Sequence, residues 1–187
     1  MAYDDGMRLM LISTSLLLAI ASAGPPLHAA QPAAQSTTGA PVPPPSGSRL
    51  VLTLSADGVQ IYTCKAQNDS TVAWTFSGPE ATLSDKPGHK AGTHSAGPTW
   101  TLTDGSTVVG EVVSKADAPE AGAIPWLLLR VKSHAGTGAL ATAAYIRRID
   151  TKGGNAPASG CDATHASQTV RVPYTATYQF FAASTVS

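Results

Sequence analysis

The chain has 187 residues, a formal net charge of zero at pH 7 and only 13% charged side chains. This length fits one domain with appended segments. The sequence lacks the basic stripe that neutralises phosphates, so the composition argues against nucleic-acid binding and against a polybasic membrane-surface patch.

The first thirty residues have the features of an export signal. Arg8 provides a short positive segment, residues 9–20 (LMLISTSLLLAI) are apolar, and the small residues ASA follow. The apolar run is shorter than the roughly 20 residues that cross a bilayer as a helix. We therefore expect a signal peptide over residues 1–30, with Met7 as a possible start. The mature protein is expected to be secreted or periplasmic and to have no integral membrane segment.

Residues 31–48 are rich in proline and alanine and show no apolar periodicity. Such a composition buries too little surface to offset its ordering entropy, so we predict a flexible, disordered linker. The domain itself is expected over residues 49–187.

Cys64 and Cys161 are the two cysteines of the chain. In an oxidising compartment an even number of cysteines indicates a disulfide, and two buried free thiols are the alternative. A metal-ligand pair is less favoured because no CxxC spacing exists. The bridge would attach the glycine-rich loop TKGGNAPASG to the end of an early strand.

From residue 50 onward, hydrophobic residues recur with period two, which is typical of half-buried antiparallel strands. In VRVPYTATYQFF, residues 170–181, every second side chain falls on one apolar face. Pro173 lacks an N–H, so the strand is expected to lie at an edge or carry a bulge there. No window of twelve or more residues predicts an amphipathic helix. The fold class is therefore all-β, a single antiparallel β-sandwich or barrel of about eight strands.

The other expected strands are separated by turn signals. RLVLTLS and VQIYTC form a hairpin about Asp57-Gly58, and TVAWTFSG ends at Gly78-Pro79. A second hairpin turns at Asp104-Gly105. IPWLLLRVKSH and ATAAYIRRID supply two further strands, the first of them central.

Several blocks occur in a characteristic order: QIYTC, GTHSAGPTW followed by DGS, IPWLLL, YIRRIDTKGGNAPASGC and VPYTATYQFF. They resemble the secreted DUF3455 family, a domain of unknown function, over roughly residues 50–181. The resemblance implies export and brings no activity with it. The positions that match recurring features of the family are Tyr62, Cys64, His94, Trp126, Tyr145, Gly153, Gly154, Cys161 and Tyr178.

The segment KPGHKAGTHSAGPTW carries His89 and His94, five residues apart. On a strand they would face opposite sides, whereas a glycine-rich loop could bring both to one copper or zinc ion. A closed site needs three or four ligands. The other candidates are His134, His165 and Asp162. The favoured interpretation is that His94 donates to a backbone carbonyl and anchors a turn, with His89 exposed.

The aromatic residues are the other candidates for a binding site. Exposed rings can stack on a sugar or another flat ligand. Most of these rings alternate with apolar inward positions, which favours core packing. Arg147 and Arg148 should face opposite sides of one strand, so that one could pair with a buried acid. The candidate ligand-binding residues are His94, Trp100, Trp126 and Tyr145.

For catalysis the sequence offers no GxSxG, no HExxH and no evident carboxylate pair, so no catalytic residue is assigned. We expect a disulfide-stabilised binding module without a cofactor. Its partner would be an unknown small molecule, a glycan or an envelope component. The alternative is a small copper- or zinc-dependent enzyme or metal carrier that uses the His94 segment.

Overall fold

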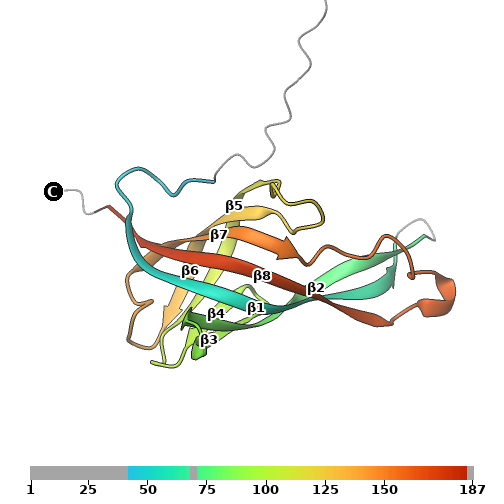
Figure 1. Cartoon of the computed structure of the whole chain (residues 1–187), viewed down its shortest axis with the longest axis horizontal. Helices are drawn as coiled ribbons and strands as arrows, with labels where there is room; N and C mark the ends of the chain where they lie inside the picture. Colours follow the sequence, from blue (N-terminus) through green and yellow to red (C-terminus); the bar gives the residue numbers. More distant parts are fainter. Residues whose placement is uncertain (1–41, 68–70, 185–187) are drawn as a thin grey trace, which may run out of the picture. The chain divides into compact units, whose positions relative to one another are not determined.

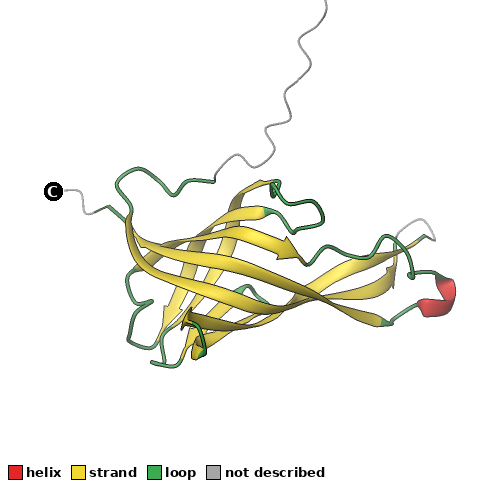
Figure 2. Ribbon diagram, in the orientation of Figure 1, coloured by secondary structure: helices red, strands yellow, loops and turns green. Residues whose placement is uncertain are grey.

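A computed structural model describes residues 42–67 and 71–184. The expected signal peptide and most of the expected linker lie outside them. The described chain forms an all-β domain, as predicted, with one 3₁₀ turn, η1 (Figure 2). In these residues no helix is both long and apolar enough to cross a membrane. The elements are β1 Arg49–Ala66, β2 Val72–Lys86, β3 His89–Ser95, β4 Thr99–Leu102, β5 Thr107–Ala116, β6 Trp126–Ala135, β7 Ala143–Gly153, η1 Ala163–His165 and β8 Thr169–Ala182.

The eight strands form a closed barrel in which each strand pairs with its sequence neighbours and β8 returns to pair with β1 (Figure 1). Of the two architectures expected, the barrel is therefore the one adopted. The β1–β8 ladder runs from Arg49 opposite Ala182 to Thr63 opposite Thr169. An eight-stranded barrel is just wide enough to be filled by side chains or to hold one small ligand.

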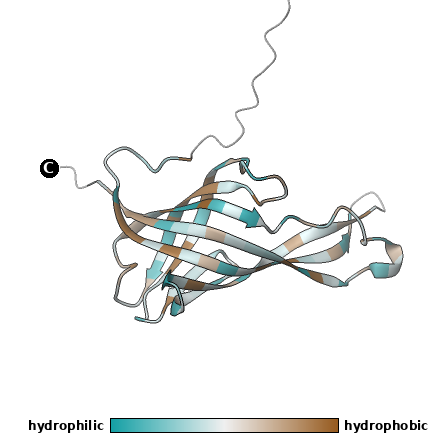
Figure 3. Cartoon of the chain, in the orientation of Figure 1, coloured by the Kyte–Doolittle hydropathy of each residue, from teal (hydrophilic) through white to brown (hydrophobic). Residues whose placement is uncertain are grey.

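Buried hydrophobic side chains form the core inside the barrel. Hydrophobic and hydrophilic residues are interspersed along the strands, as the period-two pattern predicts (Figure 3). The β6–β7 loop covers one end of the barrel by inserting Leu140, which is fully buried. Asp104 holds the loop there, because its carboxylate accepts from the backbone N–H groups of Ser106 and Ala139 at 2.9 and 2.8 Å. The buried core residues include Leu54, Leu83, Val108, Ile146 and Phe180.

At the opposite end, β1, β2 and the beginning of β8 extend beyond the other strands (Figure 1). The pairing of β7 with β8 ends where Gly153 faces Tyr174. Pro173 lies one residue before Tyr174, so β8 pairs only with β1 there. The expectation that Pro173 lies at a strand edge is confirmed, although the barrel as a whole is closed.

Two of the predicted strand ends are wrong. Asp57 and Gly58 do not form a turn, because β1 continues through them and pairs on both sides. A Cβ on Gly58 would lie 2.1 Å from the carbonyl oxygen of Glu80 and 2.5 Å from Cα of Ala81. The glycine thus permits a close approach of β2 and does not form a hairpin. Likewise β2 passes through Gly78, where the β1–β2 register shifts. The hairpin at Asp104-Gly105 is confirmed.

The last residues of the expected linker lie against the domain. Val42 is buried, and the hydroxyl of Ser184 donates to the carbonyl of Ser46 at 3.0 Å. Residues 42–48 form a loop without strand pairing. The end of the expected linker is therefore in contact with the domain at Val42 and Ser46, while Pro43, Pro45 and Gly47 are exposed.

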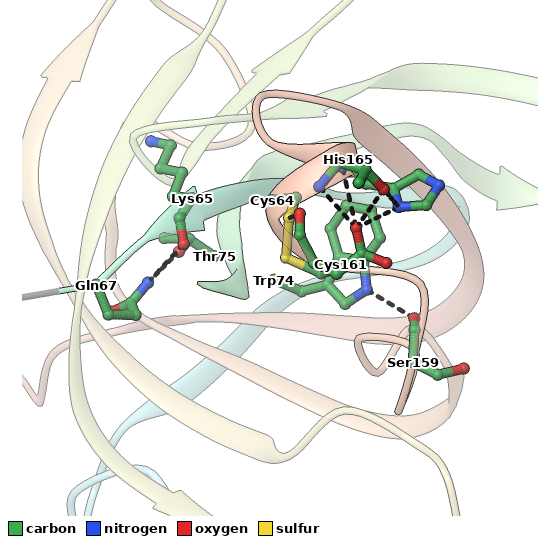
Figure 4. Close-up of a disulfide and its surroundings, with 10 residues drawn as sticks. Cys64, Lys65, Gln67, Trp74, Thr75, Ser159, Cys161 and His165 are labelled. Atoms are coloured by element: carbon green, nitrogen blue, oxygen red, sulfur yellow. Dashed lines mark hydrogen bonds and ion pairs between the residues drawn. A yellow bond between two sulfur atoms is a disulfide. The ribbon is translucent and has the colours of Figure 1, made fainter. Parts of the chain in front are cut away.

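The predicted disulfide joins Cys64 at the end of β1 to Cys161 in the loop before η1 (Figure 4). Their Cα atoms are 5.4 Å apart. The backbone of Cys64 also pairs with the segment before β8, because Ser167 N–H donates to its carbonyl and its own N–H donates to Gln168, both at 2.8 Å. Trp74 Nε1 donates to the carbonyl of Ser159 at 3.0 Å. The bridge therefore pins a long loop to the projecting strands.

Candidate functional site

A pocket of about 200 Å³ opens into the barrel beside the β3–β4 turn. Residues of β2 to β8 and the β3–β4 turn form its wall. Phe76, Pro79, Pro98, Val112, Leu127 and Leu129 make the lining mainly apolar. The side chains of His94, Trp100, Arg148 and Tyr178 bring polar groups into this apolar wall. Such a combination is typical of small-molecule sites.

His94 faces the barrel interior from β3 and is 3% exposed. Its Nδ1 lies 2.9 Å from the carbonyl oxygen of Thr99, which can only accept, so Nδ1 carries the proton. Burial lowers the pKa of His94 to about 4, the hydrogen bond to Thr99 opposes this, and the Arg148 charge adds to it. The ring is therefore neutral, and Nε2 is left as an acceptor.

Trp100 and Tyr178 pack against His94 to form an aromatic cluster below the pocket. The rings of His94 and Trp100 stack with centroids 4.3 Å apart, and Tyr178 meets both edge-on. Trp100 and Tyr178 are each 1% exposed. Yet Trp100 Nε1 forms no hydrogen bond within the described residues, whereas the Tyr178 hydroxyl has the side chains of Tyr174 and Arg148 as neighbours. Buried donors of this kind are costly unless something satisfies them.

Arg148 is half-buried, faces the interior from β7 and lies opposite Tyr178 in the β7–β8 ladder. Its Nε and Nη2 both donate to the carbonyl of Pro125, at 3.1 and 2.8 Å. This carbonyl belongs to the β5–β6 loop and fixes the guanidinium at the pocket wall. Its charge opposes the effect of burial, which raises the pKa values of Tyr174 and Tyr178. The charge of the guanidinium thus acts to lower the pKa values of His94 and of both neighbouring phenols.

The comparison with protein families gives one match. The model of the family described as "Protein of unknown function (DUF3455)" covers residues 45–182. The chain belongs to this family. No curated protein and no solved structure matches the chain. The DUF3455 domain of this protein is therefore the barrel itself, from the loop before β1 to the last residue of β8.

Two of the four candidate ligand-binding residues, His94 and Trp100, meet in the pocket of the DUF3455 domain. The other two lie elsewhere. Trp126 begins β6 and is half-buried. Tyr145 lies on β7, where it borders a shallow depression beside His134. The buried Trp100 and Tyr178 support the expectation of core packing and do not form an exposed stacking platform.

The histidines of the metal hypothesis have separate local partners. His89 is exposed and pairs with Asp85 at 2.6 Å, and His134 bonds the carbonyl of Ala143 at 2.7 Å. His165 contacts Asp162 at 2.7 Å beside the disulfide. Across residues 42–67 and 71–184, no three His, Cys, Asp or Glu side chains form a group that could hold a metal ion.

The glycine-rich segment around His94 is a hairpin of β3 and β4, where a loop was expected. His89 and His94 consequently lie near opposite ends of the same strand, β3. The expected bond from His94 to a backbone carbonyl is present, with Thr99 as acceptor. The hairpin places the ring inward because His94 shares a face with buried Gly92.

Sequence reasoning did not assign Arg148 and Tyr178 to the site. Strand alternation contained the signal, since Arg148 follows the buried Ile146 by two positions and Tyr178 precedes Phe180 by two. The expected opposite orientation of Arg147 and Arg148 agrees with their partners, because Arg147 bonds Gln179 and Arg148 lines the pocket. In the part of the chain that the structure describes, no buried acid pairs with either arginine, and Arg148 bonds the carbonyl of Pro125.

Proposed function

We propose that this protein is an exported domain that binds one small, mainly apolar molecule in the barrel pocket, without chemistry of its own. The observation that carries the proposal is the apolar pocket in the barrel, whose wall includes Trp100, a buried residue whose Nε1 has no partner among the described residues. A ligand with an acceptor group would satisfy a donor that otherwise lowers stability.

The size of the pocket limits the ligand. Cavities of roughly 150 Å³ accommodate benzene, so a volume of about 200 Å³ suits a single ring with a small substituent or a short aliphatic chain. A glycan would need a longer groove or an exposed aromatic face, and Trp100 is 1% exposed. We therefore favour a small molecule over the glycan or envelope component.

Export is supported by the signal-like residues 1–30 and by the disulfide, because disulfides persist mainly outside the reducing cytosol. Fractionation of cells that express the full chain tests this part. Recovery of the protein in the cytoplasm with two free thiols would contradict it.

Binding is tested with small probe molecules. Ala96 is exposed on the β3–β4 turn and borders the pocket, so Ala96→Trp places an indole at the mouth without changing the core. We expect ligand-observed NMR to detect binding of phenol, benzyl alcohol, benzamide or benzoate to the wild type. Ala96→Trp should abolish this binding, whereas the matched control Ala96→Ser should retain it.

Two results would overturn the proposal. One is that none of the four probes binds the wild type at millimolar concentration. The other is that the probes bind Ala96→Trp as well as they bind Ala96→Ser, which would locate binding outside the pocket. Thermal unfolding of both variants checks that the barrel is intact.

A further inference from the structure

The guanidinium of Arg148 has more donors than the protein satisfies. An arginine carries five N–H groups, and two of those of Arg148 donate to the carbonyl of Pro125. A further N–H group faces the Tyr178 hydroxyl, and the described residues offer the guanidinium no other hydrogen-bond partner. Arg148 lies opposite Tyr178 in the ladder, and the Tyr178 hydroxyl interacts with both the guanidinium and the Tyr174 hydroxyl. Several donors therefore meet at one wall of the pocket.

Arg148 also has no counter-ion among the described residues, in contrast to two arginines on the outer surface. Arg130 pairs with Glu111 at 2.7 Å, and Arg171 pairs with Glu80 at 2.5 Å. No aspartate or glutamate lines the described wall of the pocket, and none forms an ion pair with Arg148. A partly buried cation without an anion is costly, since it loses hydration and gains no compensating charge.

The groups that face Arg148 do not supply a negative charge. His94 is neutral because burial keeps its pKa at about 4. Burial raises the pKa values of Tyr62, Tyr174 and Tyr178, with the Arg148 charge opposing each increase, so the three phenols are protonated at neutral pH. The pocket is therefore positive at Arg148 and apolar elsewhere.

We propose that the pocket selects a small organic carboxylate, which places its carboxylate against Arg148 and the Tyr178 hydroxyl and its apolar body between Phe76, Trp100 and Leu127. The inference rests on the proposed function and names its ligand class. A guanidinium and a carboxylate form charge-assisted hydrogen bonds, which are shorter and about twice as strong as neutral ones. A fully hydrated inorganic anion fits less well, because the opposite wall is apolar and offers few donors.

Benzoate and benzamide provide a matched pair for the test, because they have nearly the same shape and differ in charge. Isothermal titration at low salt should give a dissociation constant about tenfold lower for benzoate than for benzamide on the wild type. Raising the salt concentration should reduce this preference, since screening weakens the ion pair.

Arg148→Gln should remove the preference by weakening benzoate binding about tenfold with little change for benzamide. Arg147→Gln is the matched control, because Arg147 is the next residue and bonds Gln179 away from the pocket. It should leave both affinities unchanged. Arg148→Lys keeps the charge without the fork and should retain part of the preference.

The outcomes separate the two proposals. If benzamide binds, Ala96→Trp blocks it and benzoate binds no more tightly, the pocket function stands and the carboxylate inference is wrong. Equal losses in Arg147→Gln and Arg148→Gln also contradict it, since they indicate a general charge effect. If neither compound binds the wild type, both proposals fall. Even if Arg148→Gln does not fold, the difference in affinity between benzoate and benzamide on the wild type tests the carboxylate inference.

Discussion

Removal of the Cys64–Cys161 bridge is expected to destabilise the barrel mainly through the unfolded chain. The two cysteines are 97 positions apart. In the chain-entropy model, closing a loop of this length lowers the conformational entropy of the unfolded state by roughly 15.7 cal/mol/K. This corresponds to about 4.7 kcal/mol at 25 °C. Unfolded chains are more compact than the model assumes, so we expect a loss of about 2–4 kcal/mol in the free energy of unfolding for the Cys64→Ala/Cys161→Ala double variant.

Urea unfolding followed by tryptophan fluorescence measures this loss. The variant should show a lower midpoint and a larger m-value, because its unfolded chain exposes more surface than the bridged one. Trp74→Phe is the control, since it keeps the bridge and loses only the bond to the carbonyl of Ser159. It should cost about 1 kcal/mol. A double variant with unchanged stability and m-value would refute the reasoning.

Two further predictions concern His94 and Gly58. His94 is neutral in the folded barrel down to a pKa of about 4, whereas the unfolded chain binds the proton near pH 6.5, so stability falls as the pH drops from 6.5 to 4, by about 3 kcal/mol. Urea midpoints across this range should show the slope in the wild type and a smaller slope in His94→Gln. Gly58→Ala should cost more than about 2 kcal/mol in the same assay, because its Cβ would meet the backbone of Glu80 and Ala81. A loss below about 1 kcal/mol, as expected for a surface turn, would show that β2 can move away.

The sequence patterns predicted the strands from residue 99 onward, although β7 continues to Gly153, into the segment expected as a loop. Alternation in β8 placed Tyr174, Tyr178 and Phe180 inward, and they are buried. It did not decide between a sandwich and a barrel, because closure depends on β8 reaching β1 and not on either strand alone. Sequence patterns specify which face of a strand is apolar and leave its partners open.

The wrong turn at Asp57-Gly58 has a specific cause. Glycine is favoured both in turns and where another backbone approaches closely, and only the neighbouring strand distinguishes the two. The same limit applied to the candidate site. Strand alternation predicts that Arg148 points inward. That no acidic residue lies beside it depends on which residues of seven strands and one turn form the pocket wall, and the sequence does not specify this.

The closing ladder has a consequence for how the protein folds. β1 and β8 pair along their lengths although more than a hundred positions separate them, so the barrel cannot close until the last strand is available. Contacts between such distant segments slow folding, because loop-closure entropy is lost before the contacts form. Until then β1 and β7 present open edges, which are templates for aggregation. A chain truncated before Thr169 is consequently expected to aggregate even though seven of its eight strands are present.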